Sequence, residues 1–168
     1  MFVGRKKELA ALERRFRTNE FECFIVYGRR RVGKSTLLKE FLKNKKSIYF
    51  TSVEGGLQAN LQNLSNAIHF ALGEPSGAVF PSYQDAFDYV FQKSQDQRLV
   101  MVFDEYPYAA RTDASLPSTL QLLIDQHQEN SKLMLILCGS SVSFMEDEVL
   151  AYRSPLYGRR TGQLRIEP

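Results

Sequence analysis

The chain has 168 residues, of which 43 % are hydrophobic and 24 % are charged, and this balance excludes a disordered or collagen-like protein. The length fits one domain. The apolar runs are far shorter than the roughly 20 residues of a membrane-spanning helix, and the charged N-terminus has no signal-peptide core. We therefore expect a cytoplasmic protein with no membrane association. Cys23 and Cys138 lie far apart in apolar runs and are expected to be buried, reduced thiols.

The net charge of +3 is distributed unevenly along the chain. The first 50 residues hold 14 Lys and Arg against 5 Asp and Glu, whereas the remainder holds 8 against 14. A basic first third indicates an anionic partner, either a nucleotide phosphate or a nucleic-acid backbone. Solvated helix faces account for part of this excess.

Short apolar runs alternate with amphipathic stretches along the chain. The apolar runs are continuous, which is typical of parallel strands covered by helices on both faces, so we expect a single α/β domain. In chain order, the pattern predicts a helix at 4–16, a strand at 22–27, a helix at 33–41, a strand at 47–51, a helix at 57–72, a loop at 73–81, a helix at 83–93, a strand at 99–103, an irregular segment at 107–116, a helix at 117–127, a strand at 132–138, a short helix at 142–150 and a strand at 163–166.

The segment between the first strand and the following helix fits a phosphate-binding pattern. It reads GRRRVGKS at 28–35, which matches G-x-x-x-x-G-K-[ST] in the strand-to-helix context that the pattern requires. Lys34 would place its charge on the β- and γ-phosphates, and the Ser35 hydroxyl would bind Mg²⁺. Backbone N–H groups of such a loop form a nest for anions. The candidate nucleotide-binding residues in this segment are Gly28, Arg31, Val32, Gly33, Lys34, Ser35 and Thr36.

Two adjacent carboxylates follow the apolar run at 99–103. Carboxyl ends of parallel strands form the edge at which such sheets bind ligands. Asp104 is therefore a candidate for the Mg²⁺ shell, and Glu105 is a candidate general base that would polarise the attacking water. The alternative interpretation is an acidic turn after a strand.

Three further groups have open interpretations. Ser140, directly after the strand at 132–138, would hydrogen-bond the γ-phosphate or the water, or would cap the next helix, a role that fits Ser141 better. Arg159 or Arg160 would reach a γ-phosphate as an arginine finger, in cis or from a neighbouring subunit, or would belong to a surface turn. The arginines at 29–31 would screen phosphate, form a basic rim that contacts nucleic acid, or be surface charge.

Taken together and in order, these segments resemble the archaeal-type ATPase family, in the STAND branch of the AAA+-like P-loop NTPases. The resemblance rests on FVGR at 2–5, GRRRVGKST at 28–36, FDEY at 103–106, CGSS at 138–141 and PLYGRR at 155–160. It implies a P-loop NTPase fold of the ASCE type, with a parallel five-stranded sheet of order 5-1-4-3-2 and the sensor strand between the Walker A and Walker B strands.

The resemblance also implies roles for single residues. Val3, Gly4 and Arg5 would flank the adenine. Ser140 would be the sensor-1 residue, and Arg159 would be the arginine of the family's PLYGR stretch. Family members usually continue into a winged-helix domain and often into an output domain. We therefore expect residues 1–168 to be a P-loop ATPase core that is part of a longer protein.

Three functions follow as expectations. The first is Mg²⁺-dependent binding and slow hydrolysis of ATP by a regulatory switch, with ATP and Mg²⁺ as cofactors and a second copy of the chain as a source of arginine in trans. The second is a kinase for nucleosides or small alcohols, and the third is a nucleic-acid-binding ATPase module with weak, non-specific affinity. The carboxylates at 104–105 favour hydrolysis, because they can activate water. Guanine recognition is excluded, because the Asn-Lys pair at 44–45 lacks the Asp of the guanine motif.

Overall fold

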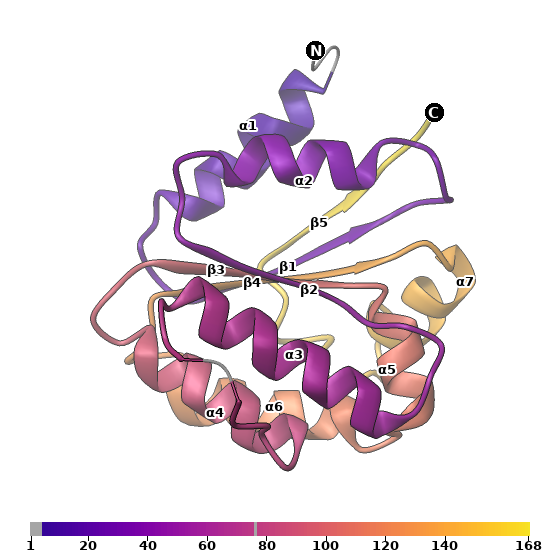
Figure 1. Ribbon diagram of the computed structural model, residues 1–168. Coiled ribbons are helices and arrows are strands. Elements are labelled where there is room, and N and C mark those ends of the chain that lie inside the picture. The colour runs from indigo at the N-terminus through magenta and orange to yellow at the C-terminus, as the bar shows by residue number, and fades with distance from the viewer. Residues whose placement is uncertain (1–4, 76) are drawn as a thin grey trace.

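Five parallel strands form the central layer of the molecule (Figure 1). The computed structural model describes residues 5–75 and 77–168, so Val3 and Gly4, which were expected beside an adenine, lie outside the described residues. The strands follow the order β2-β3-β4-β1-β5, which is the predicted order. Their bounds are Glu22–Tyr27 (β1), Ser47–Thr51 (β2), Leu99–Asp104 (β3), Leu133–Gly139 (β4) and Gly162–Arg165 (β5).

Helices cover both faces of this sheet. Figure 1 shows α1 and α2 on one face, α3, α4 and α6 on the other, and α5 and α7 beside one edge. None of the helices in the described ranges has the length and hydropathy needed to cross a bilayer. Their bounds are Lys6–Phe16 (α1), Lys34–Leu42 (α2), Leu57–Ala71 (α3), Tyr83–Lys93 (α4), Tyr106–Thr112 (α5), Leu116–His127 (α6) and Val142–Phe144 (α7), and α7 continues into a π-helix at Met145–Val149.

The alternating side chains of β4 explain why the sheet is covered on both sides. All seven residues of this strand are buried. Leu133, Leu135 and Leu137 pack into the core formed with α3, α4, α5 and α6. Met134 and Ile136 pack into the core formed with α1 and α2. Each fully buried aliphatic side chain contributes about 1.5–3 kcal/mol to stability, so both layers are needed to hold the sheet.

The strand order brings three chain segments together at the carboxyl edge of the sheet. β4 lies between β1 and β3, with Tyr27 opposite Gly139 and Phe103 opposite Leu137. The loop after β1, the carboxylates at the end of β3 and the serines after β4 therefore meet at this edge, which is where open parallel sheets bind ligands.

The segment predicted to be irregular at 107–116 is largely helical, so that prediction was wrong. α5 occupies Tyr106–Thr112, with Pro107 in its first turn. A proline is tolerated there because the first N–H groups of a helix have no partner within the helix. The predicted helix at 142–150 exists as the α-turn α7 followed by a π-helix.

Candidate nucleotide-binding site

The loop between β1 and α2 depends on two glycines for different reasons. A Cβ on Gly28 would lie 2.5 Å from the backbone oxygen of Ile166, because the chain after β5 passes close to the loop. Gly33 has a left-handed φ of 94° at the residue before α2, a conformation that glycine adopts at little cost. Arg31 is also left-handed, with a φ of 66°. The loop therefore curls tightly at the N-terminus of α2, as an anion-binding nest requires.

Lys34 is buried beneath this loop. Its ammonium group donates hydrogen bonds to the carbonyl oxygens of Gly28 at 2.7 Å and Arg29 at 2.9 Å. Burial lowers the pKa of Lys34, and the nearby carboxylates of Glu105 and Asp104 oppose this shift. The ammonium is thus held against the loop by two carbonyl oxygens, which phosphate oxygens can replace as its partners.

A cavity of about 300 Å³ opens at the start of α2. Ser35 and Thr36 present exposed side chains to it, so both hydroxyls are accessible to a ligand. The size is at the lower end of ligand pockets, which suits a phosphate chain rather than a whole nucleotide. Its lining residues are Arg31, Gly33, Lys34, Ser35 and Thr36.

Arg5 braces the loop from outside. Its guanidinium donates to the carbonyl oxygen of Val32 at 2.9 Å and to the carbonyl oxygen of Glu167, and it pairs with Glu8 at 3.3 Å. The start of α1, the loop and the chain after β5 are therefore tied together by one side chain. The structure places Arg5 and Val32 in contact at the loop, and the expected role of Arg5 beside the adenine stays a prediction.

Asp104 is held by a residue that the sequence did not single out. The phenol of Tyr49, on β2, donates to Asp104 Oδ2 at 2.9 Å, and the Glu105 N–H donates to Asp104 Oδ1 at 2.9 Å. Burial and Asp104 raise the pKa of Tyr49, whereas the nearby Ser35 side chain acts in the opposite direction. Burial also raises the pKa of Asp104. Ser35, Tyr49 and Asp104 thus converge, and they offer the hard oxygen donors that suit Mg²⁺.

Glu105 points toward the end of β4. It has a left-handed backbone, with φ 53° and ψ 41°, a conformation that costs a non-glycine residue about 1–3 kcal/mol and is typical of functional sites. The Ser52 hydroxyl donates to its carbonyl oxygen. The carboxylate accepts the Ser140 N–H and the Ser140 hydroxyl, both at 3.0 Å. Ser140 therefore contacts the candidate base, and Ser141 occupies the position before α7 without a side-chain capping bond.

Arg159 does not lie near the loop of its own chain. Its guanidinium binds the carboxylate of Asp125, near the end of α6, at 3.1 and 2.8 Å. Two residues later, Thr161 donates its N–H to Cys23 at the start of β1. This is the amino edge of the sheet, so the expectation that Arg159 reaches the phosphates in cis was wrong. The length of β1, at about 3.3 Å per residue, separates Arg159 at the amino edge of the sheet from the loop at the carboxyl edge.

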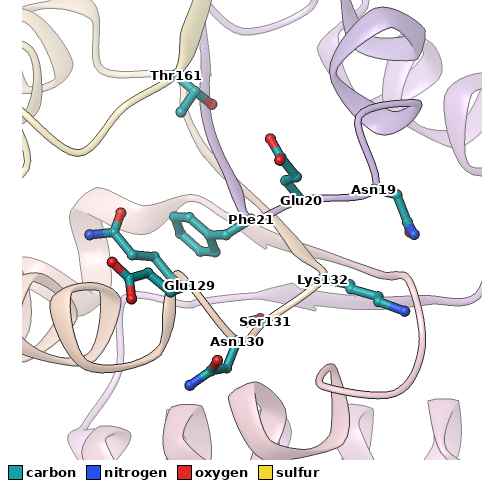
Figure 2. A pocket seen from close by; sticks show the side chains of 9 residues that line it. Asn19, Glu20, Phe21, Glu129, Asn130, Ser131, Lys132 and Thr161 are labelled. Carbon is teal, nitrogen blue, oxygen red and sulfur yellow. The ribbon is translucent and has the colours of Figure 1, made fainter.

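A larger cavity, of about 470 Å³, also lies at the amino edge (Figure 2). Phe21 precedes β1, Lys132 precedes β4 and Thr161 precedes β5, so this cavity is on the side of the sheet opposite the loop. Figure 2 shows mostly amide, hydroxyl and carboxylate side chains around it. Volume alone would favour this cavity, but the nest, the buried lysine and the paired carboxylates are at the other edge.

Both cysteines are buried and free, as expected, and burial raises the pKa of Cys23 to about 12. The two histidines also have structural surroundings. His69 stacks on Phe80 and pairs with Glu74 at 3.0 Å, and His127 stacks on Phe91.

Comparison with known proteins places the chain in a family. Residues 2–168 match a family described as an ATPase domain predominantly from Archaea. An uncharacterized protein of Methanocaldococcus jannaschii is 36 % identical over all of this chain, which spans 36 % of that relative. An uncharacterized ATP-binding protein of the same organism is 59 % identical over 46 residues, which are 27 % of this chain and 78 % of that protein.

Solved structures share the fold at lower identity. A Walker-type ATPase of Pyrococcus abyssi has a TM-score of 0.70 and 24 % identity, over 99 % of this chain and 54 % of that one. Cdc6p of Pyrobaculum aerophilum has a TM-score of 0.68 and 16 % identity, over 100 % of this chain and 46 % of that one. With the match over residues 2–168, the P-loop at the carboxyl edge and the shared sheet, the chain belongs to the family of ATPase domains found predominantly in Archaea.

Proposed function

We propose that this domain binds ATP with Mg²⁺ and hydrolyses it slowly to ADP and phosphate. The observation that carries the proposal is the meeting of Lys34, Asp104 and Glu105 at one edge of the sheet, since β4 places the ends of β1 and β3 around Ser140. Family membership supports an ATPase-type function.

The residues divide the work of an in-line displacement. The loop N–H groups and Lys34 bind the phosphates and fix their orientation. Ser35 and Asp104 would hold Mg²⁺, which when bound neutralises charge on the β- and γ-phosphate oxygens. A Glu105 carboxylate oxygen accepts a proton from water while the water oxygen bonds to the γ-phosphorus and the bond to the bridging oxygen breaks.

We expect slow turnover because two of the groups needed for hydrolysis are already bound to other groups of the protein. The Lys34 ammonium is bound to two carbonyl oxygens, and the Glu105 carboxylate is bound to Ser140. Both groups have to exchange these partners before they act on the phosphates and water. We propose that this exchange makes the domain a regulatory switch of the STAND type, and that residues 1–168 are the ATPase core of a longer protein.

Calorimetric titration with ATP, ADP and GTP, with and without Mg²⁺, tests binding. We expect adenine-selective binding that Mg²⁺ strengthens. Lys34→Met should weaken it at least about 100-fold, because it removes a charged hydrogen-bond donor from the phosphates. Lys39→Met, on an exposed position of the same helix, is the matched control and should bind as the unmodified chain does. Absence of ATP binding by the folded, unmodified chain would refute the proposal.

Hydrolysis is tested separately with Glu105→Gln. The amide cannot accept the proton, so phosphate release should fall by about 10²–10⁴-fold while ATP still binds. Normal hydrolysis by this variant would show that Glu105 is not the base. The same assay, run with nucleosides and small alcohols, separates hydrolysis from the kinase alternative, which requires a phosphorylated acceptor among the products.

A second candidate function is weak nucleic-acid binding. It rests on the 14 basic residues among the first 50, and the same fold occurs in a structure of Drosophila ORC bound to DNA. Binding of this kind falls steeply with salt, because phosphate contacts release counterions. A titration with duplex and single-stranded DNA at two salt concentrations tests it, and no binding at low salt would remove this candidate.

A further inference from the structure

A separate cavity of about 310 Å³ lies beside the candidate base, between the loop after β1 and the helix α5. It shares no lining residue with the cavity at Lys34 and Ser35. Glu105 and Ser140 are in its wall, so it opens on the side of the site where the γ-phosphate and the attacking water would meet. Its lining residues are Arg29, Arg30, Glu105, Pro107, Tyr108, Arg111, Ser140 and Ser141.

The arginines of this cavity come from two elements and two of them are held in place. Arg30 donates to the Tyr108 phenol oxygen at 2.7 Å, which links the loop to α5. The Arg111 guanidinium carbon lies 5.1 Å from the centre of the Phe144 ring, which links α5 to α7. Such contacts orient a guanidinium and leave N–H groups available to a further acceptor.

The positive charge of the three arginines in the cavity exceeds the negative charge of its wall. Across residues 5–75 and 77–168, neither Arg29, Arg30 nor Arg111 forms an ion pair. Glu105 is the carboxylate in the wall, and it is already bound by Ser140. Three guanidinium groups around one carboxylate favour an anionic ligand with oxygen atoms, because guanidinium matches phosphate geometry.

We propose that this cavity binds inorganic phosphate as a second ligand beside the bound nucleotide. The inference rests on the proposed hydrolysis, which produces phosphate next to Glu105 and Ser140. Phosphate that leaves the γ-position on this side enters a pocket with Arg30 and Arg111 in its wall. These arginines thus give the product a binding site outside the loop, while ADP still occupies the loop.

The test is a calorimetric titration of inorganic phosphate into the protein saturated with ADP and Mg²⁺, so that the loop is already filled. One phosphate should bind per chain. Arg30→Gln and Arg111→Gln should each weaken phosphate binding about ten-fold, since each removes a charged hydrogen-bond partner. The affinity for ADP should change less than two-fold. Arg14→Gln, an exposed position on α1, removes the same charge elsewhere and should leave phosphate binding unchanged.

Any other result with phosphate overturns the inference. Lack of phosphate binding to the ADP-bound protein shows that the cavity is not an anion site. Phosphate binding that persists in the Arg30→Gln and Arg111→Gln variants locates the ion elsewhere, as does equal weakening by Arg14→Gln. Failure of ADP to bind in the first place refutes the proposed function instead, so the two failures are distinguished within one experiment. Circular dichroism of each variant confirms that these exposed substitutions leave the fold intact.

Discussion

The Glu105 carboxylate accepts two hydrogen bonds from Ser140, one from the backbone N–H and one from the hydroxyl, both at 3.0 Å. The two residues follow neighbouring strands, β3 and β4, and the left-handed backbone of Glu105 turns its side chain across the gap between them. Ser140 therefore determines which direction the candidate base faces. Ser140 thus orients the Glu105 carboxylate, which is a different role from capping α7.

Ser140→Ala removes one of these bonds and keeps the other. We expect kcat for ATP hydrolysis to fall about ten-fold with KM changed less than two-fold, because a mispositioned catalytic group affects the transition state more than substrate binding. Steady-state kinetics measure both parameters. Ser143→Ala, exposed on α7, is the control and should behave as the unmodified chain. An unchanged or higher kcat would show that the hydroxyl does not orient the base.

The strands and the loop were predictable because their signals are local. The buried strands β1 and β4 are continuous apolar runs, and the loop glycines and Lys34 belong to one short pattern. The strand order was predicted only through the family resemblance. Periodicity does not reveal that β4 lies between β1 and β3.

Contacts between distant segments were not predictable from spacing. Tyr49 meets Asp104 because β2 pairs with β3, with Thr51 opposite Asp104, and nothing in the local pattern of β2 distinguishes this tyrosine from an ordinary strand residue. A sequence motif gives no information on which edge of the sheet Arg159 reaches, so its place at the amino edge could not be predicted. The helix α5, with Pro107 in its first turn, was likewise not predicted.

Tyr49→Phe tests whether the phenol positions Asp104, the carboxylate proposed to bind Mg²⁺. Loss of its hydrogen bond to Asp104 should raise the Mg²⁺ concentration for half-maximal hydrolysis about ten-fold, as loss of a group behind a metal ligand typically does. ATP binding measured without Mg²⁺ should change less than two-fold. Tyr152→Phe, at a side chain that is 84 % exposed, is the matched control. An unchanged Mg²⁺ dependence with reduced stability would assign Tyr49 a purely structural role.

Asp104→Asn should stabilise the domain at neutral pH in the absence of Mg²⁺. Burial raises the pKa of Asp104, so the native state binds this proton more tightly than the unfolded chain does. The cost of burying the charge is therefore present above the raised pKa, and it disappears as the pH falls below the ordinary carboxyl pKa.

Urea unfolding at pH 7 and at successively lower pH measures this difference. The gain in free energy of unfolding of Asp104→Asn over the unmodified chain should be greatest at pH 7. It should shrink as the Asp104 carboxyl becomes protonated in both the native and the unfolded state. Asp96→Asn, at an exposed position, controls for the loss of one negative charge. An advantage that is equal at every pH would show that the shifted titration of Asp104 does not contribute to stability.

The contact between Arg159 and Asp125 leaves a role in trans as the remaining catalytic interpretation of this arginine. The pair is partly exposed, with side chains 30 % and 44 % accessible, so its loss should cost no more than about 1 kcal/mol of stability. If a neighbouring copy supplies Arg159 in trans, Arg159→Ala should lower hydrolysis by about 10³-fold or more, because arginine fingers contribute 10³–10⁵ to kcat. Asp125→Ala breaks the same pair but keeps the arginine, and should retain hydrolysis.

Mixing two inactive variants tests the same proposal directly. Lys34→Met chains retain Arg159 but lack the lysine proposed to bind phosphate, whereas Arg159→Ala chains retain the loop but lack the arginine. A mixed assembly contains an intact loop facing an intact Arg159, so hydrolysis should recover on mixing and should increase with protein concentration. Normal hydrolysis by Arg159→Ala alone would instead assign Arg159 to holding the chain before β5 against α6, because its guanidinium forms an ion pair with Asp125.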